Sequence, residues 1–279
     1  MSNIKEHGIV IIPIDFTKQS LVAIKHAYNI ANVTKSKLLL MQAYAKESEL
    51  NKAELEKLAK QIADESKLVV ETAYVKGDIY EEANKLAEKI TANMIVVGLE
   101  PNVKFRSFMS KSNTSKFIKS APCPVLTVRG SKFNPECKNI LMPFDLNPEA
   151  REKVPFAIQL AKYFGAEIRI VSVFDPNDAK YENKLLPYMI QVKKYIKEKN
   201  VKCTNKSIPS KEVAESLVDY ANKNGCEIIV QMNPKDVTYS EMFSGTMSQK
   251  LVDISDIPVL TINPMKREQG SMFGGGLNG

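Results

Sequence analysis

The sequence has few of the residues that carry metal or redox chemistry. Its 279 residues include four cysteines and two histidines, and no two cysteines form a CxxC pair. Because structural zinc sites need four Cys or His ligands at close spacing, this composition argues against a zinc site, and we expect no metal ligands. Scattered cysteines of this kind are expected to remain reduced thiols.

Long hydrophobic runs and strong charge segregation are also missing. No apolar run approaches the roughly 20 residues that span a bilayer, and the start "MSNIKEHGIVIIPID" lacks a signal peptide's apolar region and cleavage site. We therefore expect a cytoplasmic protein without membrane contact. The net charge is +7, but lysines and glutamates alternate along helix-like stretches, which is typical of solvated helix faces. The sequence has no basic stripe with interleaved aromatic residues, so we expect no nucleic-acid partner.

The common catalytic and nucleotide-binding motifs are absent as well. No GxGxxG follows the first expected strand, and the chain contains no GxxxxGK[ST] and no GxSxG. Neither histidine, His7 or His26, lies near the end of an expected strand with a serine beside it. The sequence therefore gives no support to a dinucleotide site, a P-loop ATPase or a Ser-His-Asp hydrolase, and we expect no catalytic residues.

An internal repeat is the strongest feature that is present. "GIVIIPIDFT" near the start returns as "NILMPFDLN", which places Pro13 and Asp15 opposite Pro143 and Asp145. "APCPVLTV" returns as "SDIPVLTI" about 130 residues later. The repeat predicts one domain over residues 1–131 and a second over 138–264, joined by a polar linker. We expect the glycine-rich residues 265–279 to form a flexible tail.

Both copies alternate fully apolar runs with amphipathic stretches. In the second copy, for example, "NILMPF" precedes a helical pattern over residues 149–164. The pattern predicts two similar doubly wound α/β domains, each a five-stranded parallel sheet of order 3-2-1-4-5 with helices on both faces. In such sheets a ligand binds beyond the carboxyl ends of the strands, where the strand order reverses. We expect that place to lie between the end of strand 1 and the loop after strand 4.

Several short motifs resemble one known family. "IVIIPIDFT", the "VVG" that ends the fourth strand, the serine that begins the fourth helix and "APCPVLTV" look like a universal stress protein domain. The resemblance covers residues 7–129 and 138–263, so the chain is similar to a tandem universal stress protein. It implies that the two domains pair through strand 5 within one chain, and it leaves a further homodimer open. Many members bind ATP, so the resemblance implies ATP with magnesium, or AMP, as the ligand; others bind no nucleotide.

The resemblance also implies which residues form the sites. In the family's binders, the strand-1 aspartate and a residue at the end of strand 2 hold the adenine or ribose, and a G-2x-G-9x-G-[ST] loop wraps the phosphates. Carried over to this sequence, the pattern gives the following candidates: Pro13, Asp15, Ala43, Gly98 and Ser112 in the first copy, and Pro143, Asp145, Val173, Gly245, Thr246 and Ser248 in the second.

Both phosphate loops depart from the family pattern and keep one glycine of three. In the first copy Pro101 and Lys111 replace two glycines; a proline lacks the N–H donor, although the lysine could itself meet a phosphate. The second copy has Met232 and Lys235 but keeps Gly245 at the helix start, where phosphates bind. We therefore expect domain 2 rather than domain 1 to retain phosphate binding.

Simpler interpretations of these residues stay open. The two aspartates and the hydroxyls of Ser112 and Thr246 are good helix caps without any ligand. Gly98 could simply end its strand, and Ala43 and Val173 could be packing residues. Lys104, Arg106 and Lys111 could form an ordinary solvated loop.

The resulting hypothesis is a stress-response protein of the universal stress type, which binds and regulates without turnover through degenerate adenine-nucleotide sites. The alternatives are a nucleotide-independent interaction scaffold, or a weak ATP-hydrolysing or adenylyl-transferring enzyme. Such an enzyme needs a Ser-Gly-Gly loop after strand 1, where this chain has "DFTKQS" and "DLNPEA".

Overall fold

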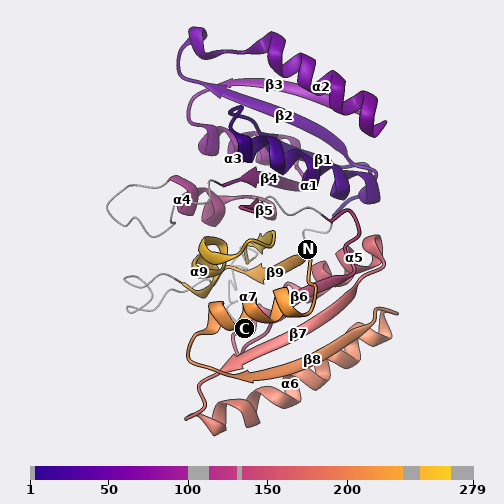
Figure 1. Cartoon of the computed structure of the whole chain (residues 1–279), viewed down its shortest axis with the longest axis vertical. Helices are drawn as coiled ribbons and strands as arrows, with labels where there is room; N and C mark the ends of the chain where they lie inside the picture. Colours follow the sequence, from indigo (N-terminus) through magenta and orange to yellow (C-terminus); the bar gives the residue numbers. More distant parts are fainter. Residues whose placement is uncertain (1–3, 100–112, 131–133, 235–245, 265–279) are drawn as a thin grey trace, which may run out of the picture.

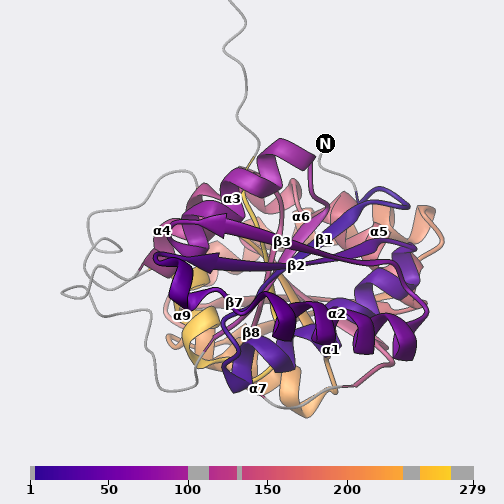
Figure 2. The same ribbon diagram turned by 90° about the horizontal axis from the view of Figure 1, so that it is seen from above.

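The computed structural model describes residues 4–99, 113–130, 134–234 and 246–264, and these form one ten-stranded sheet flanked by helices (Figure 1). The strand order is β3-β2-β1-β4-β5-β10-β9-β6-β7-β8. Each half therefore has the predicted order 3-2-1-4-5, and the predicted fold class is confirmed. Figure 2 shows that the strands of the two halves run at a clear angle to each other, because the sheet twists.

The elements of the first half are β1 (Ile9–Pro13), α1 (Lys18–Thr34), β2 (Lys37–Tyr44), η1 (Glu47–Glu49), α2 (Lys52–Ser66), β3 (Val70–Lys76), α3 (Ile79–Ile90), β4 (Met94–Gly98), α4 (Asn113–Ser120) and β5 (Val125–Val128). Those of the second half are β6 (Asn139–Pro143), η2 (Pro148–Arg151), α5 (Val154–Phe164), β7 (Glu167–Phe174), α6 (Ala179–Glu198), β8 (Cys203–Pro209), α7 (Val213–Lys223), β9 (Ile228–Met232), α9 (Met247–Ile254) and β10 (Val259–Ile262).

Two apolar layers sandwich the sheet. Helices α1, α2, α5 and α6 cover one face, where Ile12 and Ile140 lie in the core. Helices α3, α4, α7 and α9 cover the other, where Ile11 and Ile229 are buried. Consecutive residues of one strand thus enter opposite cores, which explains why the central strands are apolar throughout.

The two halves join through the antiparallel pair β5 and β10, in which Leu126 lies opposite Leu260. Contacts at the two ends of this pair correspond to each other. Arg129 after β5 donates from Nε to the carbonyl of Val252 at 3.1 Å, and Asn263 after β10 donates from Nδ2 to the carbonyl of Ile118 at 2.7 Å. The halves are therefore related by an approximate two-fold axis at this pair.

The first helical region differs between the halves. In the first half, α1 is one continuous helix that begins at the N-cap Thr17. In the second half, the single helix expected over residues 149–164 is wrong, because η2 ends at Arg151 and α5 begins at Val154. The break has a local cause: Pro155 cannot donate to the carbonyl of Arg151 and would clash with it, so it fits only in the first turn of a new helix.

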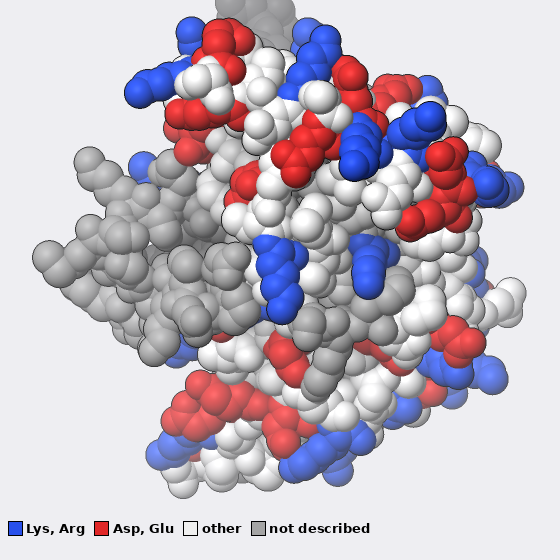
Figure 3. Space-filling view, turned by 45° about the horizontal axis from the view of Figure 1, so that its top comes forward, with Lys and Arg blue, Asp and Glu red and all other residues white. Residues whose placement is uncertain are grey.

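The surface carries mixed charge. On the face drawn in Figure 3, Lys and Arg side chains are interspersed with Asp and Glu side chains. No helix within the described ranges is long and apolar enough to cross a bilayer. The four cysteines are buried free thiols. The tail at 265–279 lies outside the described residues.

Candidate ligand-binding crevice

A cavity of about 230 Å³ lies in the second half, where β6, β7 and β9 end. Four of the candidate residues line it: Pro143, Asp145, Val173 and Ser248. The structure therefore brings together the end of strand 1, the end of strand 2 and the start of the fourth helix, as expected for the reversal point of the strand order.

Asp145 is held in place by its own loop. One carboxylate oxygen accepts the backbone N–H of Asn147 at 3.0 Å, and the other accepts its Nδ2 at 3.1 Å. The carboxylate thus holds the turn between β6 and η2 and does not cap α5, whose N-cap residue is Lys153. The half-buried side chain of Asp145 reaches the cavity wall.

At the start of α9, the two hydroxyl candidates have different surroundings. Thr246 is the N-cap: its Oγ1 accepts the backbone N–H of Gln249 at 3.3 Å, and the Gln249 side chain accepts the Thr246 N–H in return. Ser248 lies 3.0 Å from the Thr246 hydroxyl and lines the cavity. The capping interpretation of Thr246 is therefore realised in the structure, and Ser248 is the hydroxyl that faces the crevice. Gly245 lies outside the described residues.

The sequence analysis missed a lysine in the crevice. Lys153 lines the cavity although only 3% of its surface is exposed. Burial lowers the pKa of Lys153 from 10.5 to about 8, and the nearby negative charge of Asp145 partly offsets this effect. Its ammonium has no hydrogen-bond or ion-pair partner among the described residues. As far as the described residues show, the crevice therefore holds a buried cation that a bound anion would neutralise.

Tyr181 of α6 is a second residue that the sequence analysis missed. Its hydroxyl accepts the backbone N–H of Leu146 at 3.4 Å and lines the same cavity. Burial raises the pKa of Tyr181, the hydrogen bond from Leu146 lowers it, and the charges of Asp145 and Asp178 raise it further. The phenol is therefore a neutral hydrogen-bonding group at neutral pH.

The two halves differ at the residue that ends strand 4. In the first half a Cβ at Gly98 would lie 2.0 Å from the backbone oxygen of Gln19, so the glycine lets α1 pack directly on β4. Met232 occupies the same position in β9 and lines the cavity. A side chain at this position, together with the helix break before α5, keeps α5 from packing in the same way.

The described candidates of the first half lie at or near the ends of β1, β2 and β4. Asp15 accepts the N–H and the hydroxyl of Thr17 at 3.0 and 2.7 Å, and Thr17 caps α1. Pro13 is buried at the end of β1, and Ala43 near the end of β2 packs against the apolar core. Ser112 lies outside the described residues, as do Lys104, Arg106 and Lys111.

An alignment of the two copies could have shown from the sequence that Lys153 is buried. It occupies the position of Ala23, which is 0% exposed in α1. A lysine at the position of a fully buried alanine predicts either a displaced helix or a buried charge, and the structure shows both.

Known proteins share this architecture. The model of the universal stress protein family matches residues 7–129 and 136–263. Universal stress protein MJ0531 of Methanocaldococcus jannaschii is 29% identical over 140 residues, which are 44% of this chain and 82% of that protein. The crystal structure of a universal stress protein from Archaeoglobus fulgidus superimposes with a TM-score of 0.76 at 14% identity, over 94% of this chain and 98% of that one. A putative universal stress protein from Pseudomonas aeruginosa gives 0.69 at 19% identity, over 92% and 93%.

The fold and the crevice define a tandem, doubly wound α/β protein with a cavity at the carboxyl ends of its strands. With the family model matching both halves, the chain belongs to the universal stress protein family.

Proposed function

We propose that the crevice of the second half binds an adenine nucleotide and that the protein acts through this binding, without turnover. The observation that carries the proposal is the convergence of Asp145, Val173 and Ser248 on one cavity, in the arrangement that the family resemblance implies for nucleotide binders. No described residue lining the cavity is a histidine or cysteine, so no nucleophile there has an imidazole base beside it.

The cavity has suitable chemistry at each end. Val173, Val213 and Leu217 provide an apolar wall for the base, and Asp145 can accept hydrogen bonds from ribose hydroxyls. The Lys153 ammonium and the N-terminus of α9 favour an anionic group. At about 230 Å³ the cavity is smaller than typical sites for drug-sized ligands, which favours a monophosphate over a triphosphate.

Isothermal titration of the full chain with AMP, and with ATP in the presence and absence of Mg²⁺, tests the proposal. We expect AMP binding that weakens at least about tenfold in Asp145→Asn, because a hydrogen bond to a charged group contributes about 1.5–3 kcal/mol. Asp15→Asn makes the same change at the matching position of the first half, and we expect it to leave the affinity unchanged. Equal loss in both variants would place the site elsewhere. No heat and no thermal stabilisation at millimolar nucleotide would favour the interaction scaffold.

A further inference from the structure

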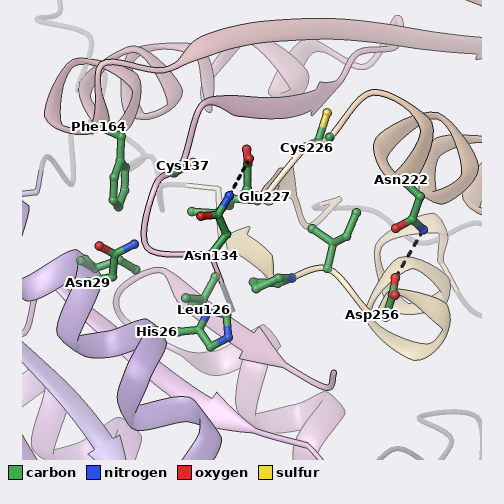
Figure 4. Close-up of a pocket in the computed structure, with 15 residues that line it drawn as sticks. His26, Asn29, Leu126, Asn134, Cys137, Phe164, Asn222, Cys226, Glu227 and Asp256 are labelled. Carbon is green, nitrogen blue, oxygen red and sulfur yellow. Dashed lines mark hydrogen bonds between the residues drawn. The ribbon is translucent and has the colours of Figure 1, made fainter. Parts of the chain in front are cut away.

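A second cavity, of about 380 Å³, lies between the two halves and is separate from the nucleotide crevice. Figure 4 shows its wall: Asn29 comes from α1 of the first half, Phe164 extends toward it from the end of α5, and Asn134 and Glu227 lie beside them. Apolar side chains form much of the lining, among them Ile30, Leu126, Phe164 and Ile257.

The approximate two-fold axis relates this cavity to a groove that is filled. The repeat places Ile4 opposite Asn134 and Gln159 opposite Asn29. Ile4 is only 3% exposed and belongs to the core. Its N–H donates to Gln159 Oε1 at 2.9 Å, and Gln159 Nε2 donates to its carbonyl. Ile4 is thus bound through its backbone by the opposite half and inserts one aliphatic side chain, just before the turn in which Gly8 donates to the Lys5 carbonyl.

The residue after the buried isoleucine is held in a similar way. Lys5 donates its backbone N–H to Asn93 Oδ1 at 3.1 Å, and Asn93 Nδ2 donates to the Lys5 carbonyl at 2.6 Å. The side-chain amides of Gln159, in the opposite half, and Asn93, in the same half as Ile4, therefore hydrogen-bond to the backbones of two successive residues. The groove therefore binds the peptide backbone as well as an apolar side chain.

At the matching place in the second half, no residue of the described ranges inserts an aliphatic side chain in the way that Ile4 does. Asn134 is exposed, and its Nδ2 donates to Glu227 Oε1 at 3.2 Å (Figure 4). Asn29, the counterpart of Gln159, lines the cavity, and its side-chain amide makes no hydrogen bond with any described residue. The exchange of Ile4 for Asn134 therefore leaves an apolar pocket with a half-buried amide at its edge.

We propose that this interdomain pocket binds a short peptide segment of a partner protein, which inserts a branched aliphatic side chain and pairs its backbone with the amide of Asn29. The occupant is defined by the chemistry of Ile4 and Lys5 in the matching groove. The carboxylates of Glu227 and Asp256 line the same pocket, so residues flanking the aliphatic one are expected to be neutral or basic. The proposal is independent of the nucleotide crevice.

The probe is a blocked synthetic peptide with the sequence of residues 3–7, NIKEH, and the control peptide has asparagine in place of its isoleucine. Binding to the full chain is followed by fluorescence anisotropy. We expect saturable binding of NIKEH at one site and none of the control peptide. Asn29→Ala should weaken binding, because it removes the amide that pairs with the backbone.

Two variants at the matching positions make the test specific. Asn134→Ile should supply the missing side chain from within the chain, raise Tm by about 3 °C or more through added apolar burial, and weaken peptide binding at least about tenfold. Ile4→Asn should open the groove of the first half and add a second binding site for the same peptide.

Absence of binding to the wild-type chain would overturn the proposal, as would equal binding to Asn134→Ile or an equal affinity for the control peptide. A lower Tm of Asn134→Ile would show that the pocket does not accept an aliphatic side chain. Dimerisation that Asn134→Ile abolishes in sedimentation would identify the occupant as the N-terminal segment of a second copy, and would overturn the assignment to a different protein.

Discussion

Replacing the buried lysine of the crevice should stabilise the protein in a pH-dependent manner. At neutral pH Lys153 is mostly protonated although it is 3% exposed, and its pKa has fallen from 10.5 to about 8, with burial as the main cause. At roughly 1.4 kcal/mol for each tenfold change in proton affinity, this difference corresponds to about 3 kcal/mol. Lys153→Met keeps the length of the side chain and removes the charge, so we expect about 2–3 kcal/mol of added stability at pH 7.

The pH dependence gives the sign of the effect. Between about pH 8 and pH 10.5 the unfolded chain binds more protons at this lysine than the folded one does, so wild-type stability rises with pH in that window. Below about pH 8 the cost of the buried charge is fully present. The advantage of Lys153→Met should therefore shrink by about 2 kcal/mol between pH 8 and pH 10.

Urea unfolding of both proteins at several pH values, with reductant present, measures this difference. Other titrating groups contribute equally to both proteins and cancel. Lys162→Met on the exposed side of α5 is the matched control, and we expect its effect to stay near zero throughout. A stability gap between Lys153→Met and wild type that is constant from pH 7 to pH 10 would falsify the reasoning, because a constant gap contains no titration of the lysine.

Three further changes probe the packing, each measured by urea unfolding. Gly98→Ala should cost about 1–3 kcal/mol, because its Cβ would meet the backbone oxygen of Gln19 at 2.0 Å; an unchanged midpoint would mean that α1 shifts freely. Arg129→Met should cost about 3 kcal/mol by leaving the buried Asp253 without its guanidinium at 3.8 Å, and a neutral result would argue against that pair. Thr246→Ala should cost about 1 kcal/mol through loss of the α9 cap, with Thr246→Ser restoring most of it.

Both cavities lie beside positions at which the two halves differ. Each half has the same layout, but matching positions next to the cavities carry different residues. Met232 in place of Gly98 and the break at Pro155 accompany the crevice, and Asn134 in place of Ile4 accompanies the interdomain pocket. In a repeat of this kind the two halves can be compared with each other. A side chain that is buried in one half shows which side chain the matching position in the other half could accept.

The sequence by itself determined the class of fold and the location of the crevice. Fully apolar runs such as residues 9–13 and 139–143 have to be buried on both faces, and connecting helices force parallel pairing, so the pattern places a crevice at the carboxyl ends of the strands. The resemblance to the universal stress protein family added Val173 and Ser248 to Asp145 as residues of that crevice, and all three line the cavity. The helix break before Pro155 could also have been predicted from the sequence, because proline disrupts the interior of a helix. The periodic apolar pattern over residues 149–164 led instead to the prediction of one continuous helix.

Only the tertiary structure decided which side chains are buried and which space is left empty. Lys153 reads as an ordinary solvated lysine until α5 and the ends of β6 and β9 enclose it, and Ile4 reads as a terminal residue until Gln159 of the other half binds its backbone. Burial and hydrogen bonding between residues 155 positions apart are set by how the two halves pack, and no local pattern of residues encodes them.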